Sequence, residues 1–222
     1  MAKNKQRIVQ NRAHKLARNK ARESRSRKAA AGATPGFEQR YGVSRAAIRA
    51  APLRRVLVSG SLFREGIGDV VVSRELEGGL LAVAVVLLDV FCLGVKDAFL
   101  RIMTPIALDA LIARAREVQP LEDAATEYAR KLVDGAIAYA RALDLEPHRD
   151  FADASVLLEG IDPAACDAVF TYGKDGKPFY VNGPSHNEQK ARSIVAHLAA
   201  RLGPDGFHYL VSLDGAPQFA DD

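Results

Sequence analysis

Apolar residues gather into three runs in the first half of the chain. The segments 53–59 (LRRVLVS), 69–76 (DVVVSREL) and 80–91 (LLAVAVVLLDVF) are rich in Val and Leu and predict three β-strands. The glycine-bearing segment 77–79 between the last two is typical of a tight turn. Because the third run is apolar at consecutive positions, both of its faces should be covered and it should lie inside the sheet. The pattern predicts an antiparallel layer of three strands.

Helical periodicity follows the third run. Two helices should begin at Pro105 and at Pro120, each with proline at its first position and with apolar residues every three or four positions. The apolar stripe of the second helix continues to Leu143. Shorter helical pieces are expected over 44–50 and 151–158.

The last third of the chain has a different pattern. Two apolar runs, 168–172 and 178–181, flank the sequence Lys-Asp-Gly-Lys of residues 174–177, which is typical of a β-hairpin. Residues 185–188 (SHNE) fit a capping box that starts a helix, and residues 207–213 predict a final strand. We expect these segments to form a ββαβ unit.

Together these elements indicate the α+β class, with a three-strand layer, a helical middle and a C-terminal ββαβ unit. Residues 37–222 are expected to form the globular domain, and the change of pattern near residue 160 leaves open whether it is one domain or two. Residues 1–36 are expected to form a basic arm and a linker, because the sequence AGATPG of residues 31–36 has the composition of a connecting segment.

Charged residues are distributed unevenly along the chain. Residues 1–28 contain eleven Lys and Arg against the single acid Glu23, a net charge of +10, so the rest of the chain carries −6 of the total of +4. This segment has few large apolar residues and its like charges repel one another. We therefore expect it to be disordered or a frayed helix by itself, and helical where a polyanion neutralises it.

This many cations favour polyanion binding over a role in solubility alone. Arg outnumbers Lys in the arm, and the planar guanidinium matches phosphate oxygens, so nucleic acid is the expected partner, with RNA favoured over DNA. Aromatic residues beside the two hairpin lysines would either stack on bases or face the core. The residues expected to bind nucleic acid are Arg7, Arg12, Lys15, Arg18, Lys20, Arg22, Arg25, Arg27, Lys28, Lys174 and Lys177.

The stretch 89–97 (DVFCLGVKD) closes the longest apolar run and holds two acids, a thiol and an amine. Cys92 and Lys96 have the elements of a thiolate nucleophile, although a free cysteine in an apolar strand is more typical of a buried structural residue. Asp89 and Asp97 are candidate acid, base or metal-binding carboxylates, but Asp97 fits equally well the first turn of a following helix.

His148 and Asp150, in the loop EPHRD, form the pair best suited to acid–base catalysis, because a carboxylate can orient an imidazole; a solvated loop is the alternative. The five histidines have no metal-ligand spacing, so no metal is expected. The segment 59–69 contains glycines but no phosphate-loop pattern. We expect a flexible connection there, and no cofactor.

Cysteine spacing and hydropathy indicate the cellular compartment of the protein. Cys92 and Cys166 have neither a disulfide framework nor zinc-ligand spacing around them, which suits a reducing cytosol. The apolar run is too short for a membrane-spanning helix, and the arm lacks an aromatic-rich amphipathic face. A cytoplasmic protein without a membrane partner is expected.

Three motifs, DVFCLGVKD, YGKDGKPFYVNGP and GAIAYARALDLEPHRDF, resemble a group of bacterial proteins with no assigned activity, over roughly residues 53–213. The resemblance implies a folded unit and supplies no catalytic residues. Two alternatives to nucleic-acid binding stay open. One is a hydrolase or nuclease that uses the carboxylates and the histidine, and the other is a protein-interaction module.

Overall fold

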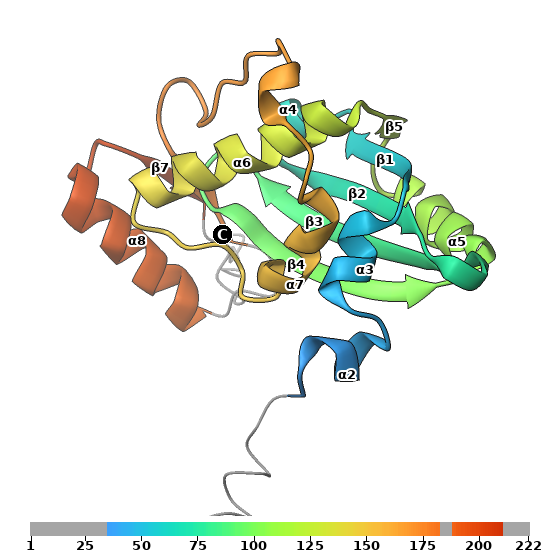
Figure 1. Ribbon diagram of the computed structural model, residues 1–222. Coiled ribbons are helices and arrows are strands. Elements are labelled where there is room, and N and C mark those ends of the chain that lie inside the picture. The colour runs from blue at the N-terminus through green and yellow to red at the C-terminus, as the bar shows by residue number, and fades with distance from the viewer. Residues whose placement is uncertain (1–34, 183–187, 211–222) are drawn as a thin grey trace, which may run out of the picture. The chain divides into compact units, whose positions relative to one another are not determined.

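The computed structural model describes residues 35–182 and 188–210 of the chain. The chain divides into two compact units, Met1–Gly42 and Val43–Asp222. The described part of the first unit holds helix α2 (Phe37–Tyr41), which Gly42 ends in the left-handed conformation. The second unit holds the sheets and the other described helices (Figure 1). No helix in the described ranges is long and apolar enough to cross a bilayer.

A five-stranded antiparallel sheet is the centre of the second unit, with strand order β4-β3-β2-β1-β5 (Figure 1). The α+β class expected from the sequence is confirmed. The three predicted strands are present, and β3 lies inside the sheet with both of its faces buried, as its continuous apolar run predicts. The strands are β1 (Leu53–Ser59), β2 (Ile67–Glu75), β3 (Leu81–Asp89), β4 (Gly94–Met103) and β5 (Leu121–Asp123).

Strands β4 and β5 are additions to the predicted three-strand layer. The placement of Asp97 in the first turn of a helix is wrong, because Asp97 lies in β4 and pairs with Leu87 of β3. The second long helix does not begin at Pro120. Residues Leu121–Asp123 instead pair with the end of β1 and form an edge strand of the sheet. The local sequence pattern does not predict this strand. The helix begins at Thr126.

Helices cover the two faces of the sheet unequally (Figure 1). On one face lie α6 and the short pieces α3, α7 and η2, and on the other α5 packs against Val71, Val83 and Val85. The alternation of side chains along each strand makes both faces apolar. The helices and 3-10 turns of this region are η1 (Glu77–Gly79), α3 (Arg45–Ala50), α4 (Leu62–Glu65), α5 (Pro105–Arg116), α6 (Thr126–Ala142), α7 (Phe151–Ala154), η2 (Ser155–Leu158) and η3 (Pro163–Ala165).

Arg74 ties the short helical pieces to β2. Its side chain is buried, and its guanidinium donates to the carbonyl oxygens of Arg49, Ala51, Leu157 and Glu159 at 2.7 to 3.0 Å. Four carbonyls that end helical turns thus share one cation. Burial lowers the pKa of Arg74, and these oxygens compensate for the water that the guanidinium loses.

The C-terminal region is a βαβ unit, not the predicted ββαβ unit. Strand β6 (Phe179–Val181), helix α8 (Glu188–Leu202) and strand β7 (His208–Leu210) follow one another, and the two strands pair in parallel. Residues 168–172 form no strand. The proposed capping residues Ser185–Asn187, and residues 211–213 of the last strand, lie outside the described residues.

The predicted Lys174–Lys177 turn is present without its first strand. The two lysines exchange backbone hydrogen bonds, and Asp175 and Gly176 adopt positive φ angles of 52° and 78°. Positive φ at both central residues is the geometry of a type I′ turn, which Asp-Gly favours. The turn therefore forms as its local sequence predicts, although the predicted strand over residues 168–172 does not form.

Candidate functional site

The connection from β1 to β2 is an ordered helical turn and not the flexible connection expected from its glycines. The carbonyl of Ser61 accepts the amides of Arg64 and Glu65, and Gly66 ends the turn with a φ of 80°. A Cβ atom at Gly66 would lie 2.0 Å from the ring of Phe91. Only glycine fits this conformation and this close approach. The turn holds Phe63 at the surface, with 38% of its area exposed.

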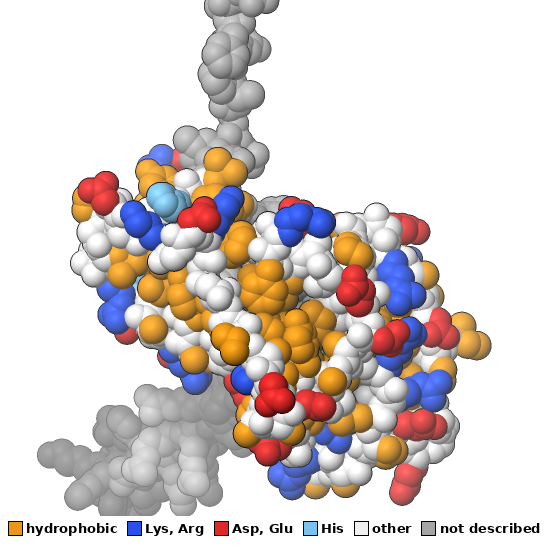
Figure 2. All heavy atoms as spheres, turned by 90° about the horizontal axis from the view of Figure 1, so that it is seen from above, with side chains coloured by type: hydrophobic (Ala, Val, Ile, Leu, Met, Phe, Trp, Pro, Cys, Tyr) orange, Lys and Arg blue, Asp and Glu red, His pale blue; other side chains and the backbone are white. Residues whose placement is uncertain are grey.

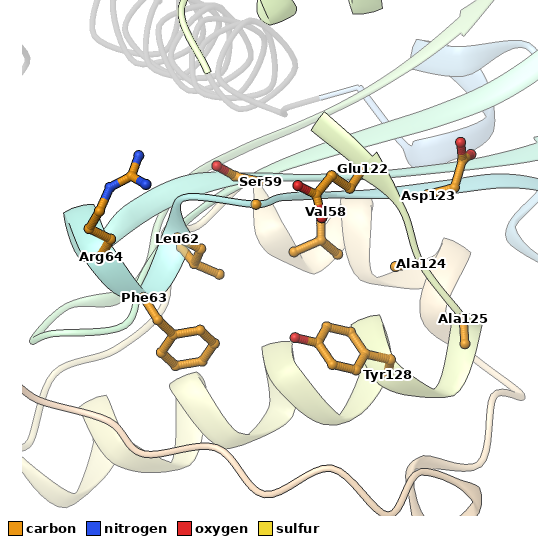
Figure 3. Close-up of a pocket in the computed structure, with 11 residues that line it drawn as sticks. Val58, Ser59, Leu62, Phe63, Arg64, Glu122, Asp123, Ala124, Ala125 and Tyr128 are labelled. Atoms are coloured by element: carbon orange, nitrogen blue, oxygen red, sulfur yellow. The ribbon is translucent and has the colours of Figure 1, made fainter. Parts of the chain in front are cut away.

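A pocket of about 360 Å³ opens between α4, β5 and the first turns of α6 (Figure 3). Phe63 and Tyr128 point toward one another across the hollow beneath β1, and Val58 points down between them. Ser59 and Arg64 point away from it. The other aliphatic lining residues are Leu62, Ala124 and Ala125.

Glu122 supplies the carboxylate of this pocket. Strand β5 places it opposite Val58, and a Cβ atom at Gly60 would lie 2.2 Å from Oε1 of Glu122, so glycine makes room for the carboxylate. Its neighbour Asp123 is bound to Arg55 at 3.0 Å, which lowers the pKa of Asp123. Among the described residues, Glu122 has no hydrogen-bond or ion-pair partner. The side chain is solvent-exposed, so its oxygens can accept hydrogen bonds from a ligand.

Aromatic rings extend from the pocket over α6. The ring of Phe170 stacks on Phe63 with centroids 5.8 Å apart and meets Tyr128 edge-on at 4.9 Å. The Tyr172 hydroxyl donates to the carbonyl of Leu132 at 2.9 Å. On the face seen from above α4 and α6, hydrophobic side chains gather around a hollow, with charged groups of both signs around them (Figure 2).

The pocket has one hydroxyl that keeps its proton. Burial raises the pKa of Tyr128, and the nearby groups Cys166 and Glu122 raise it further. The phenol therefore remains a hydrogen-bond donor across the physiological pH range. The ring of Phe63 and the hydroxyl end of Tyr128 point toward one another across the hollow (Figure 3).

The DVFCLGVKD stretch is the turn that joins β3 to β4. One oxygen of Asp89 accepts the amides of Phe91 and Cys92 at 3.0 and 2.8 Å, so this carboxyl group caps the turn. Burial raises the pKa of Asp89 to about 6 despite these bonds and the nearby charge of Lys96. Asp89 thus has a structural role in the turn.

Cys92 and Lys96 do not form an activated thiolate. Cys92 is fully buried, and burial raises the pKa of its thiol. Lys96 is half-buried, which lowers the pKa of its amine, and its Nζ donates to the carbonyl of Val181 at 3.3 Å. A reactive cysteine requires partial exposure and a lowered thiol pKa, and Cys92 has neither.

His148 lies beside both predicted carboxylates. Its Nδ1 is 3.5 Å from Oδ1 of Asp97 and 4.0 Å from Oδ2 of Asp150, and it also accepts the Asp150 amide at 3.4 Å. One ring nitrogen cannot accept that proton and donate to a carboxylate simultaneously. The backbone amide of His148 also bonds the Val95 carbonyl, so the loop extends the edge of β4.

The hairpin residues predicted to bind nucleic acid are engaged within the protein. Lys177 donates to the carbonyl of Asp205 at 2.8 Å, and Lys174 lies 4.8 Å from the ring centroid of Phe179. Tyr180 is fully buried. Phe179 is only partly buried and both lysines are exposed, so of these residues only Tyr180 is withdrawn from the surface. The arm residues Arg7 to Lys28 lie outside the described part of the chain.

Within residues 35–182 and 188–210, no group of three or more His, Cys, Asp and Glu could hold a metal ion. A second hollow, of about 700 Å³, lies between α5 and β4 and is lined by Phe99, Arg101 and Arg114. At its end the carboxylate of Asp69 accepts Gln119 Nε2 at 2.6 Å, and burial raises the pKa of Asp69.

Sequence reasoning missed Phe63, Glu122 and Tyr128 as a set. One signal was available, because Phe63 is a large aromatic residue inside a connection otherwise rich in Ser, Gly and charge. Comparison of the chain with protein-family models, curated protein sequences and solved structures finds no match.

Proposed function

We propose that this protein associates with nucleic acid, RNA in preference to DNA, through its cationic arm. The observation that carries the proposal is the gathering of eleven Lys and Arg with one acid in residues 1–28, on a chain whose remainder is net negative. Phosphate binding by such a segment releases counterions and needs no particular base sequence. The arm supplies affinity, and any selectivity belongs to the globular unit.

The charges of the globular unit support this division. Many of its cations are already neutralised by nearby carboxylates, which leaves them fewer donors for phosphate oxygens. Figure 2 shows Lys and Arg side chains beside Asp and Glu on the face seen in that view. The paired cations include Arg45 with Asp153, Arg49 with Glu159, Arg54 with Glu75, Arg55 with Asp123, Arg130 with Asp134 and Arg201 with Asp144.

The test is the salt dependence of RNA binding, measured by fluorescence anisotropy with a short labelled single-stranded RNA. If the arm neutralises six or more phosphates, affinity falls roughly a thousandfold between about 50 and 200 mM salt. A full-length variant in which the eleven arm cations are replaced by Gln should lose this steep dependence. Equal affinities for the two chains at low salt would refute the proposal, and duplex DNA of matching sequence tests the preference for RNA.

We place this activity in the cytosol. Cys92 and Cys166 are both free and buried, which is the usual state of cysteines in a reducing compartment. When cells that produce the protein are grown with a mild oxidant, both thiols of the folded protein should stay unmodified. Neither thiol is exposed to the oxidant.

A further inference from the structure

We infer that the pocket between α4, β5 and α6 binds an unpaired guanine base. The inference rests on the proposed function in naming the substrate class, and it adds the base selectivity that a cationic arm cannot provide. The pocket combines an aromatic face, a carboxylate without a partner among the described residues and a protonated hydroxyl. Each of these groups meets a different part of the base.

The aromatic face selects a planar ligand. Phe63 has 38% of its area exposed, and α4 fixes it at the entrance of the pocket. Single-stranded nucleic acids are bound by stacking bases on such rings, whereas a base within a duplex is inaccessible. The aliphatic side chains of Val58 and Leu62 complete an apolar surface for the base. A volume of about 360 Å³ is within the range of small-ligand pockets.

The carboxylate selects among bases. Glu122 presents two acceptor oxygens and no donor. Guanine carries two adjacent donors on its Watson–Crick edge, the N1–H and the N2 amino group, which match the two oxygens of one carboxylate. Adenine and cytosine place a ring acceptor beside their amino group, and uracil places a carbonyl oxygen on each side of its N–H. These acceptors would face the negative charge of Glu122 unfavourably.

The hydroxyl group of Tyr128 also favours guanine. Tyr128 keeps its proton, because burial raises its pKa. It can donate to an acceptor of a base already held by Glu122. A quaternary ammonium ion would also be attracted by an aromatic ring and a carboxylate. Trimethyllysine is therefore the competitor that distinguishes such a cation from guanine.

The experiment uses the full chain with two labelled RNA oligomers, one of uridines alone and one with a single internal guanosine. The guanosine should tighten binding about tenfold, as expected for one stacked base with a bidentate hydrogen-bonded edge. Glu122→Gln should abolish this preference and leave the salt dependence unchanged, because Gln replaces one acceptor oxygen with a donor. Glu117→Gln, which removes an exposed carboxylate at the end of α5, is the matched control and should keep the preference.

Free nucleotides distinguish a guanine within RNA from a guanine nucleotide in solution. GMP should compete with the guanosine-containing oligomer, while AMP, CMP and UMP should not. Phe63→Leu should weaken GMP binding by at least severalfold, which provides a second variant if Glu122→Gln does not fold. Binding of GMP without binding of RNA would support the pocket and refute the proposed function. RNA binding with a steep salt dependence and no preference for guanosine would refute the pocket, as would competition by trimethyllysine in place of GMP.

Discussion

At the scale of single residues, the clearest result is that Asp89 serves the turn after β3. Its oxygen accepts two backbone amides, which favours the ionised carboxylate, yet burial opposes ionisation more strongly and raises the pKa to about 6. An acid in the middle of an apolar stretch is therefore explained by backbone groups that need an acceptor. Nearby, the thiol of Cys92 is part of a cluster with Tyr180 and Leu198.

The raised pKa of Asp89 predicts how stability depends on pH. Since the folded protein holds this proton more tightly than the unfolded chain, the free energy of unfolding should fall as pH rises from about 4 to 7, by roughly 2 to 3 kcal/mol from this group. Asp89→Asn should remove this part of the dependence, because Asn still accepts the amides but does not ionise. Urea unfolding at several pH values measures the difference.

The control for this prediction is Asp167→Asn, which alters an exposed carboxylate of the segment that follows η3. It should keep the pH dependence of the wild-type protein. If Asp89→Asn and wild-type lose stability in parallel over this pH range, the carboxyl group is not the source.

At the scale of elements, the packing of α6 against the sheet depends on the glycine that begins β4. Gly94 has a φ of 65°, and a Cβ atom there would lie 2.9 Å from both the Ala136 carbonyl oxygen and the Ala140 Cβ. The small residues on this side of α6 allow the close approach. The sequence shows a glycine after an apolar run, but only the contact with α6 explains why no side chain is allowed.

Gly94→Ala should therefore cost much more than Gly78→Ala. Both glycines have positive φ, 65° and 79°, but no atom lies within 4 Å of a Cβ at Gly78. The conformation alone should cost Gly78→Ala about 1 to 2 kcal/mol of unfolding free energy. The clash should add roughly 1 to 3 kcal/mol for Gly94→Ala. Chemical denaturation of the two variants tests this prediction. Equal losses of unfolding free energy would show that α6 can move away from the added Cβ atom without destabilising the protein.

At the scale of the whole molecule, the chain separates charge from hydrophobic core. Residues 1–28 carry +10, whereas the core residues of the described structure lie between Ile48 and Phe207. The proposed function assigns affinity to the arm and selection to the globular unit, in line with this separation. Electrostatic attraction of the arm for phosphate acts over about a Debye length and is weakened by salt, while a bound base is held by short-range contacts.

The same separation predicts that arm charge and fold stability are independent. The variant with Gln in place of the eleven arm cations should unfold at the same denaturant concentration as the wild-type protein, within about 0.5 kcal/mol. Circular dichroism during urea titration measures this at moderate salt. A large loss of stability in the variant would mean that the arm cations contribute to folding, and its loss of RNA binding would then need another explanation.

The sequence by itself determined the features that depend on neighbouring residues along the chain. Continuous apolar runs predict three of the strands, proline with helical spacing predicts α5, and Asp175-Gly176 predicts the turn. Tertiary structure decided the rest. Strand β5 is three residues long and exists because it pairs with β1, and β4 alternates too weakly to stand out from a helical surface. The pocket joins Phe63, Glu122 and Tyr128 from three elements, and such convergence depends on packing between distant segments, which no local pattern encodes.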